Sequence, residues 1–443
     1  MQGKDAVLKM LRWLGWAMLA LLVMAVAAWL LSRFWPLSAA QREDRRLLEA
    51  VQPNEGRNGF ALLWTLPFDG LDQAQREAAL ADDLRRWKAS PSQASHASLL
   101  AAGHAPLNLD GAGRCAVGPV GCLAQVRADP QRFADAHAGH AGLHERLARL
   151  ADFDRFDSPF LPAGSELMPL PAYTPLLDGT SAQALAYVQG DVAGAIEGSC
   201  NAVRFGRRMM RTGSTLVDNM MGAAVVRTHA ALLADMLVEQ SPDYVLPASC
   251  EAALQPLDAD EQSLCHAMQG EFAMNKAAIE ASTQTAGSRL LLDRDHTLAR
   301  IAGNFGWACR PAAAKALAAD VPLLVPLSPR WDVGCVANPL GCTLSAIAGP
   351  SYAQYAARSQ DTAAMIRLLG AQRWLRQQPG PPDEALARLP AQWRSDARMP
   401  QLSADGRYLQ VLRRGPAREG EGPEISMPLR ADWPGLSRRR RAD

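Results

Sequence analysis

The sequence predicts a mainly α-helical protein with one N-terminal transmembrane helix, a disulfide-stapled helical body and a small C-terminal β element. Three observations lead to this prediction. Residues 13–31 form an uncharged apolar run, apolar residues recur at helical spacing along most of the remaining chain, and the eight cysteines include two matched loops. The 443 residues carry a net charge of only +1, so we expect no nucleic-acid partner.

Residues 1–36 are the predicted membrane anchor. The run from Trp13 to Leu31 has no charge and no proline, and its length at about 1.5 Å per residue matches the hydrocarbon core of a bilayer. Pro36 ends this helix. A cleaved signal peptide is the alternative, because Ala25 and Ala27 fit a small-x-small cleavage pattern. Cleavage there leaves an exposed apolar end, so we favour an uncleaved, single-pass anchor that contacts the membrane through residues 13–31.

The remaining chain divides into three predicted parts. Residues 37–57 predict a juxtamembrane helical stalk, because Ala39 to Val51 is charged and free of glycine and proline. Residues 58–400 form the predicted helical extracytoplasmic domain, and residues 401–443 a short β-hairpin followed by the basic tail Arg438 to Arg441. Within the domain, 60–66 predicts a strand or buried extended segment, 286–295 and 310–351 predict irregular chain, and the predicted helices are 72–90, 129–153, 181–211, 214–240, 258–282 and 360–377.

A turn is predicted inside the helical segment 181–211. Gly190, Asp191 and Ala195 stand at offsets that resemble the turn of tetratricopeptide-type helical hairpins. No 34-residue period continues this pattern downstream, so it predicts a single helical hairpin rather than a repeat array.

The cysteines predict disulfides. Cys115 to Cys122 and Cys335 to Cys342 both read C-x-x-x-P-x-G-C, a spacing in which proline and glycine turn the chain and bring two thiols together. Zinc binding is the alternative, but a six-residue gap that contains proline makes a poor chelate. Three pairings are open to the other four cysteines. We place Cys250–Cys265 and Cys200–Cys309 first among them.

Paired cysteines behind a membrane segment also predict a compartment. Disulfides persist in oxidising spaces, and the few lysines among the 46 basic residues are typical of a GC-rich bacterial genome. We therefore expect a bacterial inner-membrane protein with the bulk of its chain in the periplasm.

Three histidines form the candidate metal site. On one continuous helix His137, His140 and His144 fall within a 60° arc, and the i, i+4 pair has a spacing that lets two imidazoles share a zinc ion. The alternative is that these histidines border the buried apolar stripe of the same helix and bond to carbonyl oxygens. Zinc is the one cofactor that the sequence suggests.

Motifs for nucleophilic or phosphate chemistry are missing. The sequence has no G-x-S-x-G, S-x-x-K or phosphate-binding G-x-x-x-x-G-K-[ST] pattern, and disulfide-bonded cysteines cannot act as nucleophiles. We therefore expect a binding protein, an envelope-associated accessory or inhibitory factor with a protein partner, in which no catalytic activity is evident. The alternative is a periplasmic, metal-dependent hydrolase whose site is built from distant residues.

Overall fold

The computed structural model is mainly helical, with one small sheet. It describes residues 2–89, 98–107, 111, 113–116, 118, 120–161, 168–284, 286–323, 325, 331–348, 352–417 and 421–429. The predicted basic tail and Pro119 of the first cysteine loop lie outside these residues. The elements, with η for short 3₁₀ helices, are α1 (Gln2–Arg33), α2 (Ala39–Glu49), α3 (Phe60–Trp64), α4 (Gln73–Ala89), η1 (Leu99–Ala102), α5 (Cys122–Ala128), α6 (Pro130–His137), α7 (Ala141–Arg149), η2 (Leu150–Asp152), α8 (Thr174–Val188), α9 (Val192–Thr212), α10 (Leu216–Glu239), α11 (Ala248–Ala253), α12 (Ala259–Gln262), α13 (Cys265–Ser282), α14 (Ala286–Leu291), α15 (Arg294–Phe305), η3 (Gly306–Cys309), α16 (Pro311–Ala318), η4 (Val333–Cys335), α17 (Pro339–Ala348), α18 (Tyr352–Arg376), α19 (Pro382–Leu386), η6 (Ala391–Trp393), β1 (Gln401–Leu402), β2 (Tyr408–Leu412) and β3 (Glu424–Pro428).

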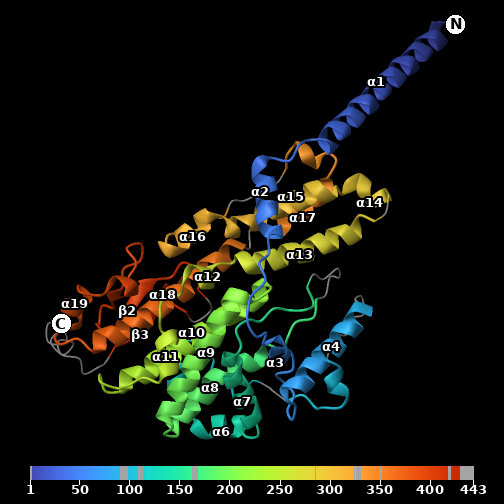
Figure 1. The fold of residues 1–443 in the computed structure, drawn as a ribbon. Helices are drawn as coiled ribbons and strands as arrows, with labels where there is room; N and C mark the ends of the chain where they lie inside the picture. Colours follow the sequence, from blue (N-terminus) through green and yellow to red (C-terminus); the bar gives the residue numbers. More distant parts are fainter. Residues whose placement is uncertain are drawn as a thin grey trace.

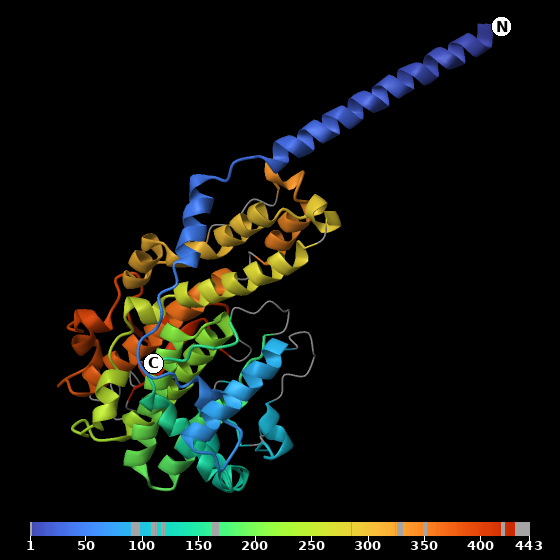
Figure 2. The same ribbon diagram turned by 45° about the vertical axis from the view of Figure 1, so that its right-hand side comes forward.

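Helix α1 projects alone from the body, as Figures 1 and 2 show. The stretch Lys9–Arg33 is long and apolar enough to cross a membrane, and its most apolar window is 0% buried. In the described part of the chain, α10 also meets these limits of length and composition, but it is 67% buried. A core helix passes the same test, so α1 is the candidate membrane span and includes the predicted run 13–31.

The centre of the body is built from α8, α9 and α10, with α18 packed against α10. Gly190 adopts φ +99° in the turn between α8 and α9, where the sequence predicts a turn, and Asp191 caps α9 through the backbone of Gly194. Helices α9 and α10 approach so closely that a Cβ added at Gly222 would lie 2.7 Å from the backbone oxygen of Gly206. Glycine therefore sets the spacing of these two core helices.

The position of α2 differs from the stalk predicted at residues 37–57. The helix forms where expected, but it packs against α13 and α15 of the body. Leu48 is 1% exposed, and the buried carboxylate of Asp44 accepts two hydrogen bonds from Arg310, at 2.8 and 2.5 Å. The charged composition suggested a solvated spacer, whereas the carboxylate of Asp44 pairs with Arg310 of the body.

Helix α3 forms where the sequence predicted a strand or buried extended segment at 60–66. Phe60, Trp64 and the three residues between them are all buried. A helix that is buried on every side shows no periodicity, and an apolar run of this length cannot be told from a buried strand by pattern alone. Phe60 and Trp64 pack with Trp87 of α4 and with Phe160 in one aromatic cluster.

The C-terminal β element is confirmed as an antiparallel sheet with the order β1-β2-β3. Its buried side chains Leu409, Val411, Ile425 and Met427 belong to the central core. A buried charge network lies next to it: Asp320 pairs with Arg367 at 2.5 Å and with Arg398 at 2.7 Å, and Arg398 also binds Asp361 at 2.6 Å. These ion pairs join the end of α16 and helix α18 to the chain that enters the sheet.

All eight cysteines are paired, and the two predicted loops Cys115–Cys122 and Cys335–Cys342 are confirmed. The other prediction is wrong, because Cys200 pairs with Cys250 and Cys265 with Cys309. The first bond joins α9 to α11 and the second joins α13 to η3, contacts that only the tertiary packing creates. The segments 286–295 and 310–351 are also more helical than predicted, since they contain α14, α16 and α17.

Candidate functional site

The three candidate metal ligands lie on two helices rather than one. His137 ends α6, His140 precedes α7, and His144 lies inside α7. Gly139 adopts φ +80° between them and breaks the helix. Asp129 caps α6, but the predicted 60° arc does not exist, because it assumed one continuous helix from 129 to 153.

The structure brings two of these histidines close together. The ring centroids of His137 and His144 are 5.1 Å apart, and those of His137 and His140 are 6.5 Å apart. Among the described residues, three potential ligands converge within 4.8 Å only at Asp332, Cys335 and Cys342. The two cysteines there form a disulfide and offer no thiolate. Zinc binding by the histidines stays a prediction.

His137 contacts a serine but does not activate it. Its Nε2 lies 3.1 Å from the hydroxyl of Ser181, which donates its own proton to the backbone oxygen of Asp178 at 2.9 Å. Ser181 is 0% exposed in the middle of α8, so no substrate reaches its hydroxyl. Asp178 in turn binds Arg114, the residue before the first cysteine loop, at 2.9 Å. The cluster therefore joins α6, α8 and that loop as a structural contact.

His144 and His229 line a small, partly open cavity of about 40 Å³ between α7, α8, α9 and α10. Burial lowers the pKa of each imidazole to about 4, so both are neutral at pH 7. Within the described chain, Nε2 of His144 and Nδ1 of His229 have no hydrogen-bond partner. His229 lies in the middle of α10, and no local pattern in the sequence pointed to it.

The base of α1 is joined to the body at several points, which we call the collar. The Ser32 hydroxyl, 0% exposed, accepts a hydrogen bond from the Ala337 backbone at 2.8 Å, and Arg33 forms a 2.5 Å ion pair with Asp293. His296 contacts the backbone oxygen of Trp35 at 2.8 Å. The hydrogen bond between His296 and Asp293 raises the pKa of His296, although burial of the imidazole opposes its charged form. Helix α1 is thus bound to η4 and to the start of α15 rather than held by a free linker.

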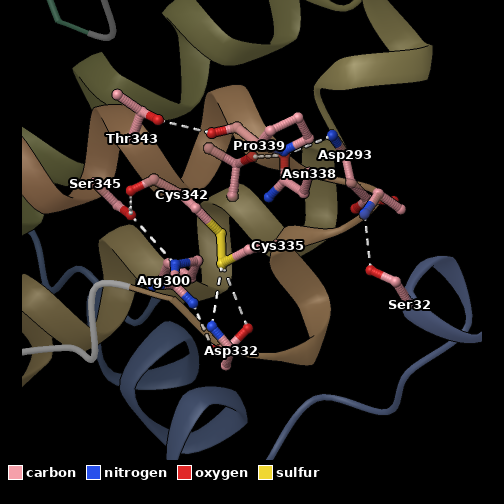
Figure 3. Close-up of a disulfide and its surroundings, with 12 residues drawn as sticks. Ser32, Asp293, Arg300, Asp332, Cys335, Asn338, Pro339, Cys342, Thr343 and Ser345 are labelled. Carbon is pink, nitrogen blue, oxygen red and sulfur yellow. Dashed lines mark hydrogen bonds and ion pairs between the residues drawn. A yellow bond between two sulfur atoms is a disulfide. The ribbon is translucent and has the colours of Figure 1, made fainter. Parts of the chain in front are cut away.

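The disulfide Cys335–Cys342 organises the collar, as Figure 3 shows. On one side of it, Asp332 pairs with the buried guanidinium of Arg300 at 2.5 Å. On the other side, the amide oxygen of Asn338 accepts hydrogen bonds from the Asp293 backbone at 2.8 Å and from Thr297 at 3.0 Å. The bond closes the turn between η4 and α17 and so holds Ala337, the partner of Ser32, in place.

A surface groove lies beside α4. Figures 1 and 2 show α4 at the end of the body away from α1. The groove is open to solvent and has a volume of about 610 Å³. Its apolar lining includes Phe60, Leu80, Leu84 and Phe153, and its charged lining consists of Arg57, Glu77, Arg149 and Asp152. The two positive and two negative groups balance, so the groove has no net charge to select an anion or a cation.

No protein-family model, curated protein or solved structure matches this chain.

Proposed function

We propose that this chain is a single-pass bacterial inner-membrane protein whose helical body faces the periplasm and binds a protein partner in an accessory or inhibitory role. The compartment is supported by the four disulfides, which leave no free thiol in the chain. Such complete pairing is typical of oxidising spaces and rare in the cytosol. The anchor is supported by the exposed apolar length of α1.

The groove beside α4 carries the protein-binding part of the proposal. Apolar side chains surrounded by charges of both signs are the usual composition of a protein interface, where apolar contact supplies affinity and the polar rim supplies orientation. The groove is open along the surface, and its lining comes from the exposed side of α4 and from α3 and η2. The occupant that fits this lining is a short segment of a partner protein with apolar side chains facing the groove.

Helix α4 offers a matched pair of positions for a test in living cells. Ala81 lines the groove, whereas Ala78 is also exposed on the same helix but lies outside the lining. A photo-crosslinking amino acid at position 81 of the full-length chain should give a discrete adduct, which mass spectrometry identifies. The same amino acid at position 78 should give little or none of this adduct.

Binding of the identified partner in purified form then decides the proposal. Ala81→Arg places a long charged side chain in the groove and should weaken the partner's affinity at least about tenfold, whereas Ala78→Arg should leave it unchanged. Equal affinity of both variants, or equal adducts at both positions, refutes the groove as the binding site. Eight alkylatable thiols in the unreduced, freshly isolated protein would refute the compartment separately.

A further inference from the structure

Exposed apolar side chains gather at the end of the body that meets the C-terminal end of α1. They come from α14, from η4 and the residue after it, and from the start of α17. We call them the membrane-proximal patch: Leu290 (58% exposed), Leu291 (54%), Val333 (44%), Val336 (51%) and Leu340 (43%). On α17 the apolar surface continues through Leu344 and Ile347, which follow Leu340 at i+4 and i+7 on the same side of the helix. A contiguous apolar surface of this kind marks an interaction site.

One contact shows which part of α1 lies beside the patch. The indole Nε1 of Trp29 donates a hydrogen bond to the backbone oxygen of Leu290 at 3.4 Å. Trp29 lies inside the apolar run that ends at Leu31, so Leu290 lies beside the last turn of the candidate span. Figures 1 and 2 both place α14 beside the base of α1. A bilayer that covers α1 to Leu31 must therefore reach the patch.

The collar prevents the patch from moving away from this level. Two contacts hold the last turn of α1 next to patch residues. Ser32 bonds to Ala337, which follows Val336, and Arg33 pairs with Asp293, two residues after Leu291. The disulfide Cys335–Cys342 closes η4 onto α17, and the chain from η4 to the start of α17 supplies three of the patch residues. Anchor and patch therefore form one structural unit.

The residues around the patch have the composition of a membrane interface. Arg289 is exposed on α14, and Arg294 is exposed at the start of α15, where it pairs with Glu280. Phe34 is 79% exposed and Trp35 is 46% exposed directly after the span. Aromatic rings and arginines are the side chains that favour the boundary between headgroups and acyl chains.

We propose that the membrane-proximal patch inserts into the interfacial layer of the same bilayer that α1 spans, so that the body contacts the lipid directly. The occupant is the boundary between phospholipid headgroups and acyl chains. Apolar side chains at that depth remove their surface from water, and the neighbouring arginines contact lipid phosphates. The inference rests on the membrane anchor of the proposed function but not on its protein partner.

The test uses an environment-sensitive NBD fluorophore on single introduced cysteines of the full-length chain. Leu291→Cys reports on the patch, Leu22→Cys on the span, and Leu412→Cys, at a leucine that is 66% exposed on β2, serves as the matched control. Each variant is purified without reductant, and one label per chain verifies that the native disulfides are intact. The proteins are placed in nanodiscs of phosphatidylcholine and phosphatidylglycerol, with or without doxyl-labelled lipid.

We expect doxyl lipid to quench the probe at position 291 at least about twofold and its emission to shift to the blue, as at position 22, with neither change at position 412. Quenching at position 22 without quenching at position 291 overturns the inference but leaves the anchor intact. A blue shift at 291 without lipid quenching means that protein covers the patch, a second copy or a partner, and also overturns it. No quenching at position 22 refutes the anchor itself. A second set of variants, with Val336→Cys in place of Leu291→Cys, guards against a local effect of the label.

Discussion

Acid should destabilise the helical body through its buried histidines, and His229 is the sharpest case. Its side chain lies in the centre of α10 and is 2% exposed, and burial lowers the pKa of the imidazole from the usual 6.5 to about 4. Unfolding returns the pKa to its usual value, so below pH 6.5 the unfolded chain binds a proton that the folded chain excludes. The stability that depends on neutral His229 is therefore complete above pH 6.5 and is lost as the pH falls toward 4.

The expected magnitude follows from these two pKa values. Between pH 7.5 and pH 5.0 they predict a loss of about 2 kcal/mol in the free energy of unfolding. The variant His229→Gln removes the titrating group at a similar side-chain volume. It should be less stable at pH 7.5, and it should also lose about 2 kcal/mol less than the wild type on acidification. Urea unfolding of the full chain in detergent micelles, followed by tryptophan fluorescence at both pH values, measures the difference.

The pH slope, rather than the stability at one pH, decides this prediction. His104 provides the control, because its side chain is exposed to water in the folded chain and His104→Gln should keep the slope of the wild type. His144 lines the same cavity, and burial lowers its pKa to about 4 as well, so the double variant with His229→Gln should flatten the slope further. If His229→Gln loses as much stability between pH 7.5 and 5.0 as the wild type, the cavity does not exclude protons and the reasoning fails.

Three further predictions concern stability and are measured by the same urea unfolding. Replacing Cys200 and Cys250 by serine opens a loop of about 50 residues and should cost about 4 kcal/mol on the chain-entropy model; an unchanged midpoint contradicts it. Gly222→Ala should cost about 1–3 kcal/mol because its Cβ meets the backbone of α9, whereas Gly287→Ala in the open side of α14 should be neutral or stabilising. Asp320→Asn should cost about 3–5 kcal/mol, because it leaves the largely buried Arg367 without a carboxylate and Arg398 with that of Asp361 alone; a cost below about 1 kcal/mol contradicts this account.

Much of the helical framework could be predicted because its signals are local. Periodic apolar residues located α9 and α10, glycine and aspartate located the turn before α9, and two proline-containing loops located two disulfides. The prediction failed where local signals are ambiguous. The buried run 60–66 has no periodicity to separate helix from strand, and the charges of α2 look the same whether water or the body pairs with them.

The candidate sites were harder to predict, since each depends on residues that packing brings together. One glycine in a left-handed conformation, Gly139, breaks the helix on which the histidine arc depended, and the backbone conformation of this single residue cannot be derived from the pattern around it. His229 joins His144 only because α7 and α10 border the same cavity. The patch beside α1 could not be found either, because exposure is a property of the folded surface and not of the residue type.

The collar has a consequence for partner binding that a flexible linker would not provide. Only the residues between Arg33 and Ala39 separate α1 from α2, and contacts of Ser32 and Trp35 hold the chain at both sides of Arg33. A body fixed in this way cannot rotate freely about its anchor, so the groove beside α4 keeps a defined direction relative to the bilayer. A partner in the same membrane then meets an already oriented site and loses less orientational freedom on binding. Insertion of flexible residues between Leu31 and Ser32 separates the candidate span from the collar contacts. It should therefore weaken binding of a membrane-bound partner more than binding of its soluble fragment, and equal losses for both would refute this role of the collar.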